Sequence, residues 1–169
     1  MWNRSRLIVF LSPTQETVKH KLPAGGAGER IYILVLEEED ETVKCLTHFV
    51  ERKRVTAASV SAIGAFRSAT IAIFEFETKH YRTIPVEVQS EVLSMLGDVG
   101  VDESGRPSVH LRVVLSLSDG STRGGHFLAD HIQPALEFAL RETPAELKRT
   151  HRPHLATALI DLTSYVSNF

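Results

Sequence analysis

The strongest constraint on the fold is a run of alternating residues between positions 106 and 127, RPSVHLRVVLSLSDGSTRGGHF. Every second residue from Val109 to Leu117 is apolar, which is the period of a strand with one buried face. The Asp119-Gly120 pair that follows is typical of a tight turn between paired strands. The segment therefore predicts an antiparallel hairpin, with His110 and Arg112 side by side on the face opposite the apolar one.

Two registers fit this hairpin, and they place His126 on different faces. If the Asp-Gly pair alone forms the turn, Ser118 pairs with Ser121 and His126 falls on the apolar face. If the loop has three residues and ends in a left-handed glycine bulge, Leu117 pairs with Ser121 and His126 lies opposite Arg112.

The alternation favours the three-residue loop. In that register Phe127 turns to the apolar face, and Gly124 lies beside Val114, where a side chain would crowd the opposite face. We therefore expect His110, Arg112 and His126 to share one surface. Two imidazoles on a sheet are more often hydrogen-bonded structural groups than metal ligands, because a zinc centre normally needs three or four protein ligands.

The chain before this hairpin reads as strands around one longer helix. Residues 30–36, RIYILVL, have the composition of a buried strand. A helix is expected to follow up to residue 54, with Asp40 as its cap. Its acidic beginning and basic end complement the helix dipole, which we favour over two partner-binding patches. The apolar face of this helix contains Val43, Cys45, Leu46, Phe49 and Val50.

Further strands are expected after the helix, with turn signals between them. The first two are separated by a turn at Gly64-Ala65, and an acidic loop at 102–105 follows the fourth. Residues 135–142 fit either period and are assigned to a strand. Thr143, Pro144 and Glu146 have the spacing of a capping box and predict a short helix ending near Arg149. The remaining expected strands are residues 57–63, 68–76, a weaker stretch ending at Val88, 91–101 and 155–162.

These elements predict one α+β domain, a mainly antiparallel sheet with the longer helix packed on it. The 169 residues and their 43% apolar content are enough for a single core. The expected organisation is an N-terminal extension at 1–28, in which residues 6–12 can add a strand, the domain at 29–163, and a C-terminal tail at 164–169.

Charge and cysteine content restrict the expected partners and compartment. Nineteen basic against twenty-one acidic side chains give a net charge of -2, so no global positive field attracts nucleic acid. The best local basic patch is residues 147–154, which we interpret as a solvated helix end and loop. The single Cys45 suits packing in a reducing compartment, and the apolar run at 7–11 is too short to cross a bilayer. We expect a cytoplasmic protein without a membrane partner.

Several segments resemble, in order and spacing, the PPC (plants and prokaryotes conserved) domain. They are ASVSAIGAFRSATIAIFEFETKHY, EVLSMLG and GRPSVHLRVVLSLSDGSTRGGHFLADHI, and the likeness covers roughly residues 29–163. The resemblance implies an α+β fold that assembles as a homotrimer. Plant members follow AT-hook DNA-binding motifs in nuclear regulators, whereas prokaryotic members usually stand alone.

The resemblance also implies a metal site, which this sequence alters. Many prokaryotic members look like His-x-His followed by Gly-Gly-His, three imidazoles suited to a divalent metal. Here His110 and His126 match the first and third imidazoles, but the middle position is Arg112. A guanidinium cannot ligate a cation and repels it, so no cofactor is predicted and a divalent metal is disfavoured.

An arginine between two histidines suits an anion instead, such as a carboxylate or a phosphate. The expected anion pocket contains His110, Arg112 and His126, with Gly124 and Gly125 beside them. An ion pair between Arg112 and Glu91 would make the site purely structural, and this alternative stays open. The SGRPS stretch at 104–108 lacks the first arginine and the basic flanks of an AT-hook and is interpreted as a loop.

The favoured function is a homotrimeric binding and assembly module, linked to DNA-associated or transcription complexes through protein contacts or binding a small anion. One alternative is a metal- or anion-dependent enzyme that uses His110 and His126 for acid–base work, although no carboxylate pair, nucleophile triad or cofactor loop accompanies them. The other alternative is direct DNA binding. Clustered basic residues with interleaved aromatic ones would support it, but the sequence shows no such cluster.

Overall fold

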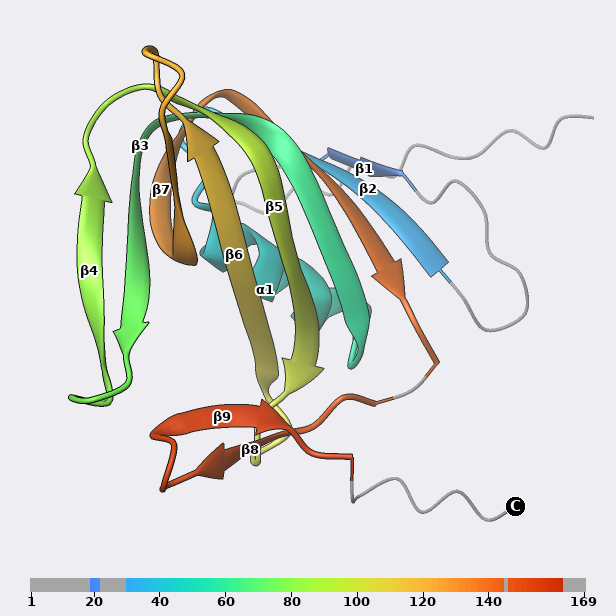
Figure 1. The fold of residues 1–169 in the computed structure, drawn as a ribbon. Helices are drawn as coiled ribbons and strands as arrows, with labels where there is room; N and C mark the ends of the chain where they lie inside the picture. The colour runs from blue at the N-terminus through green and yellow to red at the C-terminus, as the bar shows by residue number, and fades with distance from the viewer. Residues whose placement is uncertain (1–18, 22–29, 145, 163–169) are drawn as a thin grey trace, which may run out of the picture.

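The computed structural model describes residues 19–21, 30–144 and 146–162. A mainly antiparallel sheet dominates it, with one helix against one face (Figure 1). The strand order in the larger sheet is β1-β2-β7-β6-β5-β3-β4. The elements are β1 (Lys19–Lys21), β2 (Arg30–Glu37), α1 (Thr42–Lys53), β3 (Ala58–Glu75), β4 (His80–Val86), β5 (Ser90–Val101), β6 (Pro107–Ser116), β7 (Thr122–Glu142), β8 (Arg149–Arg152) and β9 (Thr157–Ile160).

The two long strands β3 and β7 pair with each other along most of their length and bend at several bulges. The expected turn at Gly64-Ala65 is therefore wrong, because both residues belong to β3, which continues past them without a turn. Gly64 is required for a different reason: a Cβ at this position would lie 2.3 Å from the carbonyl oxygen of Ala135 on β7. The glycine thus permits a close approach of two backbones.

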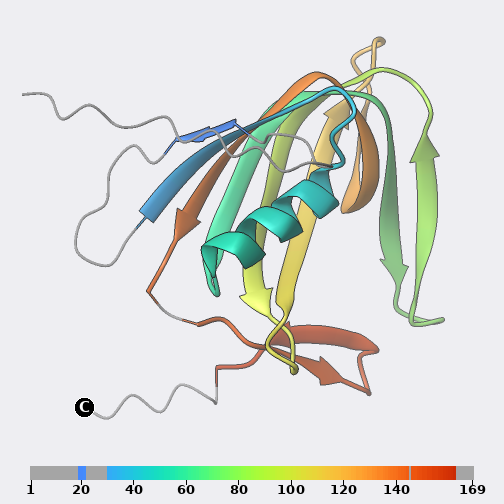
Figure 2. The ribbon, with the colours of Figure 1, turned by 180° about the vertical axis from the view of Figure 1, so that it is seen from behind.

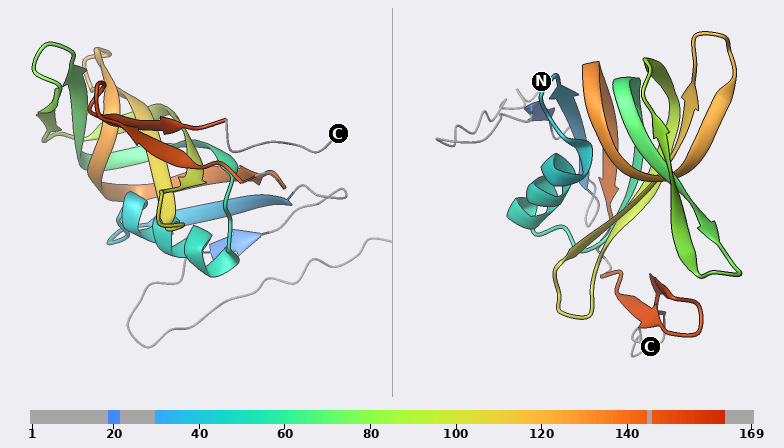
Figure 3. Two further views of the ribbon diagram at one scale, coloured as in Figure 1. Left: turned by 90° about the horizontal axis from the view of Figure 1, so that it is seen from below. Right: turned by 90° about the vertical axis from the view of Figure 1, so that its left-hand side faces the viewer.

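Helix α1 packs across one face of the curved sheet (Figures 2 and 3). Its face with Leu46, Phe49 and Val50 is buried in the core, and Cys45 is buried with it, as the sequence predicts. The N-cap differs from the prediction. Glu41 accepts hydrogen bonds from the backbone N–H groups of two residues in the first turn, while Asp40 accepts from the backbone N–H of Glu37.

The hairpin of β6 and β7 has the register expected with the three-residue loop. Arg112 lies directly opposite His126, and Val114 lies opposite Gly124. The backbone N–H of Leu117 donates to the carbonyl of Ser121 at 2.9 Å, and Gly120 has a left-handed φ of 78°. The adjacent Phe127 is buried, as this register requires. The residues 135–142 are part of β7, which confirms that they form a strand.

The short helix expected after Thr143 does not form. The backbone N–H of Thr143 donates to the carbonyl of Ala57, and the N–H of Leu147 donates to the carbonyl of Thr56. The carbonyl of Leu147 in turn accepts from the N–H of Val101. These long-range hydrogen bonds join the described residues of this segment to the residues just before β3 and to the end of β5, and they replace the ones that a helix would have made.

The chain ends in a second, two-stranded sheet made by β8 and β9, which lies below the ends of β5 and β6 in Figure 1. The expected closing strand at 155–162 is present as β9. In the N-terminal extension only β1 is described, paired with β2, and the possible strand at 6–12 lies outside the described residues. No helix among the residues that the structure describes could span a membrane.

Candidate functional site

The structure brings His110, Arg112 and His126 together. Arg112 and His126 are cross-strand partners, and the ring centroids of His110 and His126 are 5.0 Å apart. The ring of Tyr81, on β4, lies 4.9 Å from that of His126 on its other side. The three predicted residues thus share one surface, and an aromatic ring that the sequence analysis did not include completes the group.

His110 takes part in a network of charged side chains with Asp98 and Arg149. Asp98 lies opposite His110 in the pairing of β5 with β6, and its carboxylate is 3.5 Å from His110 Nδ1. The guanidinium of Arg149 contacts the same carboxylate and also lies 3.4 Å from His110 Nδ1. Burial alone would raise the pKa of Asp98, but the hydrogen bonds from His110 and Arg149 outweigh it and lower that pKa.

His126 is held neutral at pH 7. Burial is the largest cause that lowers the pKa of His126 to about 4, and His110, Arg112 and Arg149 contribute to the same shift. Its Nδ1 is buried without a hydrogen-bond partner in the described part of the chain. The imidazole therefore sits where added positive charge is unfavourable and a negative group is favourable.

A half-open cavity of about 490 Å³ lies in front of Arg112 and His126. Its walls come from the β3–β4 hairpin, from β6 and β7, and from the β8–β9 hairpin. His110 stands next to His126 outside the lining. Among the described residues that line the cavity none is a carboxylate; they are Ala72, Ile73, Phe74, Phe76, Lys79, Tyr81, Arg112, His126, His154, Leu155 and Thr157.

The two glycines next to His126 serve mainly the strand packing. A Cβ on Gly125 would lie 2.6 Å from the carbonyl oxygen of Ala72 on β3, so only glycine lets β7 approach β3 here. A Cβ on Gly124 would lie 3.0 Å from the carbonyl oxygen of Val113 and 3.5 Å from the side chain of Val114. The two glycines contribute to the expected anion pocket by allowing the close strand packing that positions His126.

Glu91 is placed away from the other predicted residues. In the register of β5 with β6, Glu91 pairs with Ser116, whereas Arg112 pairs with Leu96. Within the described part of the chain, Glu91 does not make the ion pair with Arg112 that would have made the site structural. The carboxylate in the neighbourhood is instead Asp98, which is paired with Arg149.

The residues around His110 and His126 do not fit a metal ion. In the described ranges no group of three or more histidine, cysteine, aspartate or glutamate side chains is arranged to hold one. Two guanidinium groups, of Arg112 and Arg149, flank the two imidazoles, and Arg149 already neutralises Asp98. A divalent cation would meet two fixed positive charges and too few donors.

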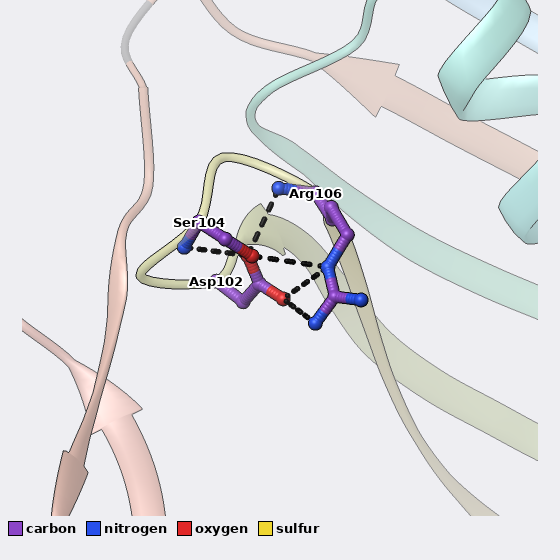
Figure 4. Close-up of polar contacts among 3 residues, drawn as sticks. All are labelled: Asp102, Ser104 and Arg106. Atoms are coloured by element: carbon purple, nitrogen blue, oxygen red, sulfur yellow. Dashed lines mark hydrogen bonds and ion pairs between the residues drawn. The ribbon is translucent and has the colours of Figure 1, made fainter.

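The SGRPS stretch begins in the loop between β5 and β6 and enters β6 at Pro107 (Figure 4). The Asp102 carboxylate accepts hydrogen bonds from Ser104 and from the backbone and side chain of Arg106. Ser104 and Arg106 together lower the pKa of Asp102 to about 2. The arginine that an AT-hook would insert into a DNA groove is therefore bound to the carboxylate of its own loop.

Sequence reasoning missed Asp98, Arg149, Tyr81 and His154. Asp98 could have been found, because it is a single charged residue in the otherwise apolar and glycine-rich end of a strand. Arg149 and His154 could not, because the segment that carries them was expected to be a helix end and loop. Tyr81 reaches His126 only through the pairing of β3 with both β4 and β7.

Solved structures of similar proteins share this fold. A plant- and prokaryote-conserved (PPC) protein from Pyrococcus horikoshii is 26% identical, with a TM-score of 0.73 over 78% of this chain and 91% of that one. A protein provisionally described as DNA-binding, from Bacteroides thetaiotaomicron, is 26% identical with a TM-score of 0.76 over 84% and 96% of the two chains. A metal-containing protein from Archaeoglobus fulgidus is 26% identical with a TM-score of 0.71 over 86% and 99%.

No curated protein sequence matches the chain significantly. The sequence profile of the Plants and Prokaryotes Conserved (PCC) domain, however, matches residues 24–144, well over half of the chain. The fold agrees with it, since the structure shows the single α+β domain that the resemblance implied. The chain therefore belongs to the Plants and Prokaryotes Conserved domain family.

Proposed function

We propose that this chain is a homotrimeric binding and assembly module that holds a small anion between Arg112 and His126. The observation that carries the proposal is the cavity in which these two side chains meet. Arg112 and Lys79 bring positive charge to it, and the neutral His126 can donate a hydrogen bond without adding a further charge. With no carboxylate among the described lining residues, the positive charge has no internal partner there.

An exposed apolar surface supports the assembly. Leu96, Ile63 and Leu93 are 59%, 60% and 54% exposed on the outer face of the sheet, where they line one shallow groove. Contiguous exposed apolar surface of this kind typically marks a protein–protein interface. Because the chain resembles a domain that assembles as a homotrimer, we infer that the partner covering this groove is another copy of the chain.

This apolar surface continues directly into the anion site. Each residue in one row across the sheet lies directly opposite the next in the strand pairing, so the row connects the apolar groove to the cavity without a break. The members of this cross-strand row are Ile33, Ala139, Ser61, Leu96, Arg112 and His126.

A role in DNA-associated complexes is proposed through protein contacts rather than through direct DNA binding. The relative from Bacteroides thetaiotaomicron is provisionally described as DNA-binding. In this chain the basic segment 147–154 lies in β8 and its turn, where Arg149 pairs with Asp98 and Arg152 with Asp161. Since these charges are largely compensated, we expect no gel-shift retention at moderate salt; retention would favour direct DNA binding.

An enzymatic role has less support in the site. General acid–base catalysis at neutral pH needs a group that titrates near 7, and the pKa of His126 at about 4 is far from that value. The Asp98–His110 pair has the arrangement of an orienting carboxylate, but the other oxygen atom of the same carboxylate is already paired with Arg149. These contacts support binding rather than turnover.

The anion site is tested by titrating inorganic phosphate and sulfate into the protein by calorimetry. Arg112→Gln should weaken binding at least tenfold, about 1.4 kcal/mol, because it removes the fixed positive charge from the cavity. Arg123→Gln is the matched control. Arg123, on β7, is exposed as Arg112 is, but strand alternation turns its side chain to the face opposite His126. Equal binding by wild type and Arg112→Gln, or no binding by wild type, would contradict the proposal.

A further inference from the structure

The cavity has Arg112 and His126 at one end and aromatic rings along one wall, and Lys79, in the turn of the β3–β4 hairpin, adds a second positive charge. From His126 a series of rings leads outward along the β3–β4 hairpin: Tyr81 is 4.9 Å from His126, Phe74 is 5.1 Å from Tyr81, and Phe76 is 5.8 Å from Phe74. These are the separations of rings in direct contact.

The outermost ring is not explained by the protein's own packing. Phe76 is 86% exposed, although phenylalanine is among the residues most often buried. Leu155, in the turn between β8 and β9, lines the same cavity from the opposite side and is 40% exposed. Apolar side chains thus face the cavity from two hairpins that are far apart in the sequence.

The wall made by the β8–β9 hairpin is fixed in place. Arg149 at the start of β8 pairs with Asp98 of β5 and donates to the carbonyl oxygen of Ala158. The backbone N–H of His151 donates to the carboxylate of Glu103, in the loop between β5 and β6. Because both anchors join the hairpin to the main sheet, Leu155 and His154 are held facing the cavity.

We propose that this cavity selects an amphipathic anion, a small organic acid whose carboxylate meets Arg112 and whose flat apolar body lies among Tyr81, Phe76 and Leu155. This rests on the proposed anion-binding function and adds the chemical class of the ligand. A volume of about 490 Å³ is in the range of small-molecule sites, and it exceeds what a single inorganic anion fills. The lining surface is mainly apolar, which is also typical of such sites.

The experiment compares acetate, benzoate and 2-naphthoate with the neutral 2-naphthamide, each titrated into the full chain by calorimetry. Affinity should rise at least tenfold from acetate to 2-naphthoate, and the amide should bind at least tenfold more weakly than the acid. Equal affinity for acetate and 2-naphthoate would overturn the ligand class and leave the anion site standing. Absence of binding by every anion, inorganic phosphate included, would overturn both.

Two variants locate the binding. Phe76→Ser and Leu155→Ser each replace an exposed side chain, so the fold is expected to tolerate them, and each should weaken 2-naphthoate binding several-fold with acetate unaffected. Val88→Ser is the matched control, an exposed apolar residue outside the cavity lining. Binding of 2-naphthoate that is the same in Phe76→Ser, Leu155→Ser and Val88→Ser would place the acid elsewhere and overturn the proposal.

Discussion

At the scale of single residues, His126 combines a buried ring nitrogen that lacks a described partner with the central position in the site. Its ring is enclosed by Tyr81 and His110, and its Nδ1 has no hydrogen-bond partner in the described part of the chain. A buried polar atom without a partner costs about 1–3 kcal/mol. Such a cost is tolerated at sites that bind a ligand, where local stability is given up for recognition.

The lowered pKa of His126 predicts a loss of stability at acid pH. The ordinary histidine pKa of 6.5 applies to the unfolded chain, whereas that of folded His126 is about 4. Between these values the unfolded chain binds a proton that the folded chain does not, so the free energy of unfolding falls as the pH falls. After allowance for partial exposure the fall is about 1–2 kcal/mol. Denaturant unfolding at pH 7 and pH 4.5 measures it.

A variant is needed to isolate this contribution, because Asp130 acts in the opposite direction. Burial raises the pKa of Asp130 to about 6 despite hydrogen bonds from Thr42, so its protonation stabilises the folded chain as the pH falls from about 6. His126→Gln cannot titrate and should lose less stability than wild type between pH 7 and pH 4.5. His48→Gln, exposed on α1, is the control; an identical acid loss in His126→Gln would contradict the assignment.

At the scale of elements, the β8–β9 hairpin depends on one buried ion pair. The side chain of Arg149 is only 10% exposed where it meets Asp98. Removing Arg149 leaves the half-buried carboxylate of Asp98 with the imidazole of His110, at 3.5 Å, in place of a guanidinium.

Arg149→Met should therefore lower the free energy of unfolding by about 1–3 kcal/mol and make the Pro153–Ala156 turn more sensitive to proteolysis. The double variant Asp98→Asn, Arg149→Met should recover part of the loss, because no unpaired charge then remains. Arg152→Met, on the same hairpin but with a more exposed ion pair to Asp161, is the matched control. A loss no larger than that of Arg152→Met would show that the Asp98 pair does not anchor the hairpin.

Elements differed in how far the sequence could predict them, and the reason is the range of their hydrogen bonds. The β6–β7 register follows from alternation and from the Asp119-Gly120 turn, both local signals. The capping-box pattern after Thr143 is local as well, but backbone partners on β3 and β5 outcompete it. The site shows the same division, since the hairpin trio was predictable, whereas Asp98 and Arg149 meet only through tertiary pairing.

At the scale of the whole molecule, the cross-strand row connects the apolar groove to the anion site. Leu96 is directly opposite Arg112, so a copy of the chain that covers Leu96 lies next to the cavity. In the proposed trimer, assembly and anion binding would then be coupled, and each would change the free energy of the other by the same amount.

A charge placed in the groove tests the assembly. Leu96→Glu should dissociate the homotrimer to monomers, because a carboxylate would be buried without a partner in the interface. Light scattering coupled to size-exclusion chromatography gives the mass, and circular dichroism checks the fold. Val88→Glu, exposed but outside the groove, is the control. A monomeric wild type, or a Leu96→Glu variant of unchanged mass, would contradict assembly through this face.

The β8–β9 hairpin lies beyond residues 24–144, the segment that the family profile matches, yet it supplies one wall of the cavity. A chain cut after residue 144 would therefore keep Arg112 and His126 but lose the wall that carries His154 and Leu155.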